Sequence, residues 1–305
     1  MSVGACGVIR PGGSTARSPA SHAASPRAQI PHQANHQAAL RSTRTASRVA
    51  GPPPLVPPTA AHPLTILVIG DSLGEDLGYG LQDLLGAQPA VRVVMAAVGS
   101  TGLANRAYYN WPAALVPLLV RNRPGVVVAL FGGNDAVGFD QGGHPVPFGS
   151  ARWQRDYGAR VATVMREATA AGAHVLWVGL PIMAPSSVLP NAAIRALNAV
   201  YRAEARVHPG VAYVSTWSLF QAPQGGYTPV LVTRRGVPEV VRDPDGVHIA
   251  PPAGDELLAS YVVAALDRAD GLRICPSAGD LWHRFDPPGC DPPASSPPVT
   301  PGAAR

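Results

Sequence analysis

Residues 64–74 have the sequence Leu64-Thr65-Ile66-Leu67-Val68-Ile69-Gly70-Asp71-Ser72-Leu73-Gly74. The segment begins with a continuous apolar run rich in β-branched side chains, which is typical of a strand buried on both faces of a parallel sheet. A helical pattern follows at Glu75–Leu85. Because ligands of open α/β sheets bind beyond the carboxyl ends of the strands, this junction is the first candidate for a site.

The rest of the chain repeats this alternation of apolar run and helical pattern. Further strands are expected at Val91–Ala97, Val126–Phe131, His174–Leu180 and Val211–Val214. Further helices are expected at Trp111–Arg121, Ala151–Ala171, Pro190–Val207 and Gly254–Ala269. Alternating strands and helices predict an α/β fold, a three-layer α/β/α sandwich with a mostly five-stranded parallel sheet and right-handed crossovers.

The two ends of the chain differ in composition from this middle part. Residues 1–63 hold six arginines, no acidic residue and few large apolar side chains, so we expect a disordered tail. Residues 64–270 are expected to form the domain, and residues 271–305 a Pro-rich extension. Within that extension, Cys275 and Cys290 either form a disulfide, which would indicate an oxidising compartment, or stay as two free thiols.

Charge and hydropathy narrow the classes of partner. Outside the arginine-rich tail the chain has 18 basic and 19 acidic residues, so it lacks the basic surplus that nucleic-acid binding needs. No run of 18 apolar residues occurs, so we expect no stable insertion into a membrane. We expect a secreted or cell-envelope location, with the cytoplasm as the alternative because the first residues lack a clear secretory signal. The sequence leaves the oligomeric state open.

Four short motifs carry the candidate chemistry. Ser72, at the strand-to-helix junction, would hold its hydroxyl above the sheet near the positive end of a helix. A turn at Gly99–Gly102 can aim a backbone N–H at the same place, and Asn134 offers a neutral amide donor. Asp245, three residues before His248, can hold the imidazole in the tautomer that leaves its other nitrogen free as a base. Each motif alone is common, and the order of all four along the chain gives the set its weight.

The chain resembles the SGNH/GDSL hydrolase superfamily over residues 64–269, in four blocks: Gly70-Asp71-Ser72-Leu73, the Gly102 turn, Gly133-Asn134-Asp135 and Asp245-x-x-His248. The resemblance implies a flavodoxin-like fold and acyl transfer through a covalent serine intermediate. It implies Ser72 as nucleophile, with Asp245 and His248 as the other members of a triad. We expect no cofactor and no metal, because the histidines show no zinc-type pairing with cysteine and no acidic cluster suggests calcium.

The same resemblance implies the donors of an oxyanion hole. Gly102 and Asn134 would act there beside the N–H of Ser72. Ala97 stands where the superfamily often has asparagine, which leaves Gly99 as an alternative to Gly102.

Candidate substrate contacts are Asp71 in the first block and the aromatic-rich segment that follows the Gly102 turn. In that segment Asn105, Tyr109 and Trp111 would overhang the serine, and Tyr and Trp suit a sugar ring or a small polar alcohol. An equally weighted alternative to substrate contact is that Tyr109 and Trp111 pack against the next helix.

The leading hypothesis is a serine hydrolase that cleaves short acyl esters, such as O-acetyl groups, of a carbohydrate or cell-envelope substrate. An O-acyltransferase that uses the same serine is an alternative, since only water exclusion and acceptor binding distinguish the two. A lipase or lysophospholipase is a further one, although residues 136–150 do not resemble an apolar lid. A glycan-binding module on the same fold would predict loss of a triad residue. Near the triad, Arg242 either faces an anionic substrate group or, as we expect, pairs with Asp243.

Overall fold

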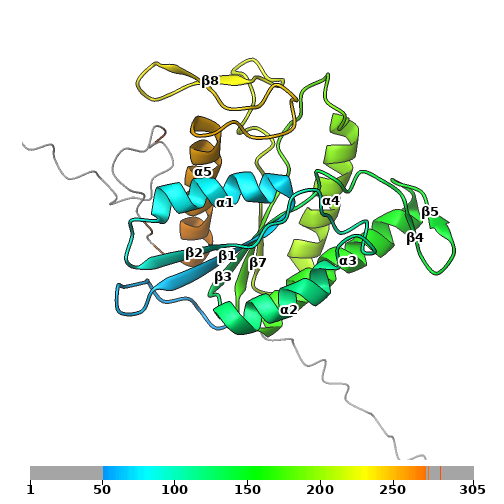
Figure 1. Cartoon of the computed structure of the whole chain (residues 1–305), viewed down its shortest axis with the longest axis horizontal. Helices are drawn as coiled ribbons and strands as arrows, with labels where there is room; N and C mark the ends of the chain where they lie inside the picture. Colours follow the sequence, from blue (N-terminus) through cyan, green and yellow to red (C-terminus); the bar gives the residue numbers. More distant parts are fainter. Residues whose placement is uncertain (1–50, 273, 275–281, 283–305) are drawn as a thin grey trace, which may run out of the picture. The chain divides into compact units, whose positions relative to one another are not determined.

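A computed structural model describes residues 51–272, 274 and 282 of the protein (Figure 1). Its central sheet has five parallel strands in the order β2-β1-β3-β6-β7. The strands are β1 Leu64–Gly70, β2 Val91–Met95, β3 Val126–Leu130, β6 His174–Val178 and β7 Val211–Val214. All five strands start where the apolar runs predict them, and β2, β3 and β6 end one or two residues earlier than expected. The predicted α/β fold with a five-stranded parallel sheet is confirmed.

Five long helices cover the sheet in two groups. They are α1 Ser72–Leu85, α2 Trp111–Asn122, α3 Ala151–Ala170, α4 Asn191–Val207 and α5 Ala253–Asp270. Helices α1 and α5 pack against one another, and α3 packs against both α2 and α4. With the sheet between them, the two groups form the three layers of the sandwich.

Strand order fixes where a site can lie. The chain leaves β1 for its neighbour β2 and then crosses back to β3 on the other side of β1. Loops that leave the carboxyl ends of β1 and β3 therefore diverge at a topological switch point, where open α/β sheets bind ligands. Register places Gly70, at the end of β1, beside Leu130, at the end of β3.

Two short antiparallel hairpins were not expected from the sequence. One pairs β4 Phe139–Asp140 with β5 Pro145–Val146, and the other pairs β8 Val230–Val232 with β9 Pro238–Val240. Strands of two or three residues are too short for periodicity to reveal them. The second hairpin matters for the site, because β9 leads directly into the segment with Asp245 and His248.

Residues 51–63 contain no helix or strand, yet they contact the domain. The carbonyl oxygen of Pro53 lies 2.9 Å from Nε2 of His174, and Leu55 packs against the core. Residues 1–50, Cys275 and Cys290 lie outside the described residues, so the expected tail and disulfide stay predictions.

Candidate active site

The turn from β1 into α1 positions Ser72. Gly70 adopts a φ of 155°, and a Cβ at this position would overlap the carbonyl oxygen of Leu130, so the close approach of β1 and β3 requires glycine. Asp71 caps the helix by accepting the N–H of Leu73 at 3.1 Å, which makes Ser72 the first helical residue. The helix thus begins three residues earlier than the sequence predicted, and its N-terminus carries the serine.

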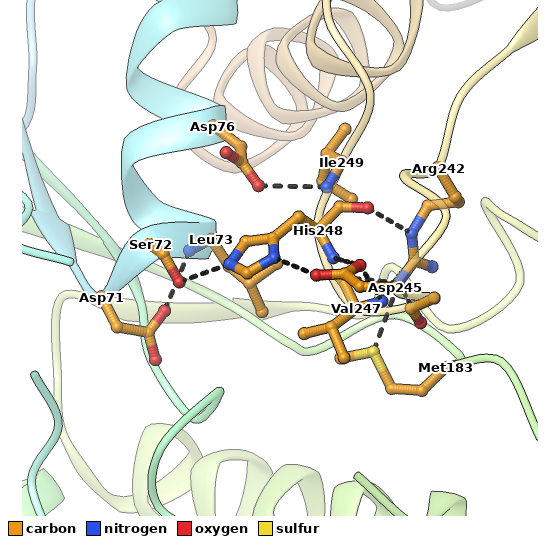
Figure 2. A network of polar contacts seen from close by, with 11 residues as sticks. Asp71, Ser72, Leu73, Asp76, Met183, Arg242, Asp245, Val247, His248 and Ile249 are labelled. Atoms are coloured by element: carbon orange, nitrogen blue, oxygen red, sulfur yellow. Dashed lines mark hydrogen bonds and ion pairs between the residues drawn. The ribbon is translucent and has the colours of Figure 1, made fainter. Parts of the chain in front are cut away.

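Ser72, His248 and Asp245 form one hydrogen-bonded chain (Figure 2). Ser72 Oγ lies 2.9 Å from His248 Nε2, and His248 Nδ1 lies 2.6 Å from Asp245 Oδ2. The other carboxylate oxygen of Asp245 accepts the backbone N–H groups of Val247 and His248 at 2.8 and 3.0 Å. With Nδ1–H bonded to Asp245, Nε2 is the nitrogen free to accept the proton of the Ser72 hydroxyl.

The protonation states of this pair suit a general base. Burial lowers the pKa of His248, but the hydrogen bond and charge of Asp245 and the charges of Asp76 and Asp243 outweigh it, so the pKa lies above 6.5. Burial raises the pKa of Asp245, but the N–H donors of Val247 and His248 and the His248 ring hold it below 3.8 overall. Asp245 is therefore ionised at neutral pH, and its charge favours the protonated form of the His248 ring.

The pKa of His248 gives a first prediction. Only neutral His248 can accept the Ser72 proton, so kcat/KM for an ester should fall as the pH drops through a pKa above the ordinary histidine value of 6.5. A kcat/KM profile from about pH 5 to pH 9 at constant ionic strength measures this limb. A profile that stays flat below pH 6.5 would contradict the assignment of His248 as the base, and a midpoint below that value would contradict the raised pKa.

The loops after β2 and β3 bring the two proposed oxyanion donors together. Asn134, an exposed residue, donates from Nδ2 to the carbonyl oxygen of Thr101 at 2.9 Å, which places its amide beside the Gly102 turn. The N–H of Gly99 is engaged by Glu75 Oε1 at 2.9 Å. Among the described residues the N–H of Gly102 has no hydrogen-bond partner, which favours Gly102 over Gly99 as a donor.

A buried aspartate joins the first and third of these loops. Asp71 is fully buried, and its Oδ2 accepts the N–H groups of Gly132 and Gly133 at 2.8 and 2.7 Å, while its Oδ1 caps α1 through Leu73. Burial and the charge of Asp135 raise the pKa of Asp71 to about 7, although its three N–H donors lower it. Both oxygens are occupied, so the prediction that Asp71 contacts substrate is wrong. Asp71 holds the turn of Ser72 against the loop of Asn134.

A second buried aspartate joins the third loop to the second. Asp135 Oδ1 accepts the N–H of Ala104 at 2.7 Å, and Oδ2 accepts the hydroxyl of Tyr157 at 2.6 Å. A Cβ on Gly102 would overlap Asp135 Oδ1, so the close approach of this carboxyl requires glycine there. Sequence reasoning missed the role of Asp135, although the residue stands in the motif next to Asn134. The two aspartates explain how three separate loops hold one geometry.

The aromatic segment after the Gly102 turn is divided between core and surface. Trp111 is fully buried and donates its indole N–H to Thr101 Oγ1 at 3.0 Å, so it packs α2 against the sheet and offers no surface to a substrate. Tyr109 is partly buried, with its ring centroid 4.9 Å from that of Trp111. Asn105 is exposed and accepts the N–H of Tyr108 at 3.2 Å. Asn105 and Tyr109 both reach solvent, so their contact with a substrate stays a prediction.

Arg242 is a structural residue of the His248 loop. It is almost fully buried, and its guanidinium donates to the carbonyl oxygens of Ile182 at 2.6 Å and Val247 at 2.8 Å. Burial lowers its pKa to about 10. In the part of the chain that the structure describes, no ion pair joins it to Asp243, so the expected pairing is wrong. The Arg242 guanidinium thus ties the loop that carries His248 to Ile182, in the segment after β6.

The described residues, 51–272, 274 and 282, contain neither a metal-binding cluster nor a membrane-spanning helix. No group of three or more His, Cys, Asp or Glu side chains in this part of the chain is placed to hold a metal ion. None of its helices combines the length and apolar character needed to cross a membrane.

Comparison with known proteins identifies the family of this chain. The family model described as "Protein of unknown function (DUF459)" matches residues 65–265. No curated protein matches the chain. Among solved structures, the chain is similar to TesA at 26% identity and a TM-score of 0.46, covering 67% of this chain and 98% of that one. It is similar to the psychrotrophic esterase EstA from Pseudoalteromonas sp. at 15% identity and a TM-score of 0.45, covering 67% and 97%.

It is also similar to the acetyl xylan esterase AlAXEase at 15% identity and a TM-score of 0.48, covering 67% of this chain and 100% of that one. The family model spans more than half of the residues of this chain and includes the strands and loops that carry the site. The chain therefore belongs to the DUF459 family.

Proposed function

We propose that the protein is a serine-dependent hydrolase of carboxylic esters. The observation that carries this proposal is the continuous chain of hydrogen bonds from Asp245 through His248 to Ser72 Oγ. A serine hydroxyl is a weak nucleophile unless a base takes its proton, and this chain supplies both the base and the group that orients it. Further support is the position of Ser72 at the switch point between β1 and β3, where open α/β sheets bind their ligands.

In the proposed reaction, Ser72 Oγ attacks the ester carbonyl carbon while its proton passes to His248 Nε2. The N–H groups of Ser72 and Gly102 and the amide of Asn134 stabilise the tetrahedral oxyanion. His248 then gives the proton to the leaving alcohol, and the acyl group stays on Ser72. Water, deprotonated by His248, attacks the acyl-enzyme, and the proton returns to Ser72 Oγ as the carboxylic acid leaves.

The finer part of the proposal is the substrate, a short acyl ester such as an O-acetyl group on a carbohydrate or cell-envelope alcohol. Support comes from the loop that begins at Gly102, where Tyr108 is 64% exposed and Tyr109 is partly exposed. Tyrosine rings there offer an apolar face and a hydroxyl edge to a sugar.

Hydrolysis of nitrophenyl esters with acyl chains of two to twelve carbons, followed by acetylated glycans, tests this proposal. We expect turnover that is highest for the two-carbon ester and falls with chain length, with free acid as the product. Highest turnover of the long chains would favour a lipase, and acyl transfer to an added glycan acceptor would favour a transferase. Absence of turnover on every ester would contradict a hydrolase.

Asn134 provides a second prediction. Removal of one oxyanion donor typically costs about 10²- to 10³-fold in kcat, so Asn134→Ala should lose activity in that range with the fold intact. The isosteric Asn134→Asp should lose at least as much, because a carboxylate cannot donate to an oxyanion. Asn122→Ala, which removes an amide at the far end of α2, is the matched control and should keep full activity. Full activity in both Asn134 variants would remove Asn134 from the oxyanion hole.

A further inference from the structure

Asp76 connects the helix of the nucleophile to the loop of the base (Figure 2). It lies four residues after Ser72 in α1, so the two side chains share one face of the helix. Its Oδ2 accepts the backbone N–H of Ile249 at 3.0 Å, and Ile249 directly follows His248. One helix therefore contacts His248 through Ser72 Oγ and the next peptide group through Asp76.

The hydrogen bond from Ile249 to Asp76 links the His248 loop to a different element from the one that its other anchors contact. The Arg242 guanidinium and the N–H of Ala184, which donates to the Gly246 carbonyl at 3.0 Å, tie the loop to the segment after β6. Asp76 ties it to α1. The side chains of His248 and Asp245 are 37% and 49% exposed, so packing alone does not fix the distance between His248 and the serine.

The charge of Asp76 also acts on the base. The ionisable groups that act on Asp76 or respond to its charge are His248, Asp243 and Arg242 from the loop, Glu75 from its own helix and Asp255 from α5. Burial raises the pKa of Asp76 to about 6, while the Ile249 N–H and His248 lower it, so the group is largely ionised above neutral pH. A negative charge here favours the protonated form of His248.

We propose that Asp76 is a positioning residue of this site, which holds the His248 loop against the nucleophile's helix and whose negative charge stabilises the imidazolium formed in the reaction. The inference rests on the proposed function, in which His248 becomes protonated as Ser72 attacks. Asp76 acts through His248 and touches no substrate.

Two variants separate the hydrogen bond from the charge. Asp76→Asn keeps an oxygen that can accept the Ile249 N–H but removes the charge, whereas Asp76→Ala removes both. Asp83→Asn, at an exposed position two turns further along the same helix, is the matched control for loss of a negative charge.

The ring signal of His248, assigned in NMR spectra by its loss in His248→Gln, is titrated at low ionic strength in wild type and each variant. We expect Asp76→Asn to lower the pKa of His248 by about half a pH unit, since a single charge at this range acts weakly through solvent. The acid limb of kcat/KM should move to lower pH by the same amount. Asp83→Asn should move neither.

The turnover number tests the positioning part. Asp76→Asn should keep kcat within about threefold of wild type, and Asp76→Ala should lower it about tenfold with little change in KM, as expected for a misplaced base. An unchanged pKa of His248 in Asp76→Asn, or equal kcat in the two Asp76 variants, would overturn the inference. The NMR titration needs no substrate. Absence of esterase activity in wild type would therefore contradict the proposed function, whereas the pKa of His248 in Asp76→Asn would still decide whether the Asp76 charge acts on His248.

Discussion

Ser72→Ala should abolish ester hydrolysis, with kcat lowered by about 10⁴-fold or more and the fold unchanged. Loss of a triad nucleophile costs that much because no other group can form the acyl-enzyme, and only binding and the oxyanion donors still act. The removed hydroxyl lies at the surface end of α1, where its hydrogen-bond partner His248 remains open to water. Stopped and continuous assays on a nitrophenyl ester, with circular dichroism for the fold, measure both parts.

Ser186→Ala is the matched control for this variant. Ser186 is an exposed serine in the loop between β6 and α4, and its loss should leave kcat unchanged. Equal activity in Ser72→Ala and wild type would refute the assignment of Ser72 as nucleophile. If Ser186→Ala lost as much activity as Ser72→Ala, the loss would reflect lower stability of the protein and not removal of the nucleophile.

Asp71→Ala should have the largest effect on stability. The change removes the acceptor of three backbone N–H groups, those of Leu73, Gly132 and Gly133. A buried donor left without a partner costs about 1–3 kcal/mol, so we expect the free energy of unfolding to fall by about 3 kcal/mol or more. Activity should also fall at least tenfold, since the turn of Ser72 and the loop of Asn134 lose their shared anchor. Urea unfolding and kcat at low temperature measure the two effects.

Asp140→Ala is the control for a lost aspartate cap. Asp140 is exposed and accepts one N–H, that of Gly143 at 2.8 Å, so its loss should cost under about 1 kcal/mol. An Asp71→Ala protein as stable as the Asp140→Ala protein would contradict the role given to Asp71.

The stability difference at Asp71 should also depend on pH. Burial raises the folded-state pKa of Asp71 from 3.8 to about 7, so the folded protein binds this proton more tightly than the unfolded chain. The stability that the group contributes is complete below about pH 4 and is lost as the pH rises through about 7. The gap between wild type and Asp71→Ala should therefore narrow between about pH 4 and pH 7 and stay constant at higher pH.

The order of the strands and helices, and the three residues of the proposed triad that the structure brings together, could be predicted from the sequence. Buried parallel strands such as β3 have a continuous apolar run that needs no long-range information. Asp245 and His248 are three residues apart, so their pairing is a local property of one loop. Ser72 could be placed because its motif lies at the end of β1.

Features that depend on distant contacts could not be predicted. Asp71 accepts N–H groups 61 and 62 residues away, and no local pattern distinguishes that role from contact with a substrate. Trp111 and Arg242 each stand in a polar stretch of sequence, but the fold buries both side chains. The start of α1 was placed too late because Gly74 weakens the helical pattern, whereas the Asp71 cap sets the true beginning.

Covalent labelling with a fluorophosphonate tests the central claim most directly. Such a reagent phosphonylates a serine only where a neighbouring base has activated it and oxyanion donors stabilise the adduct. We predict one adduct per chain, located by peptide mass spectrometry on Ser72, that forms in step with loss of esterase activity and is absent in His248→Gln. An unmodified Ser72 after complete inactivation, or an adduct on another residue with activity lost, would contradict the account.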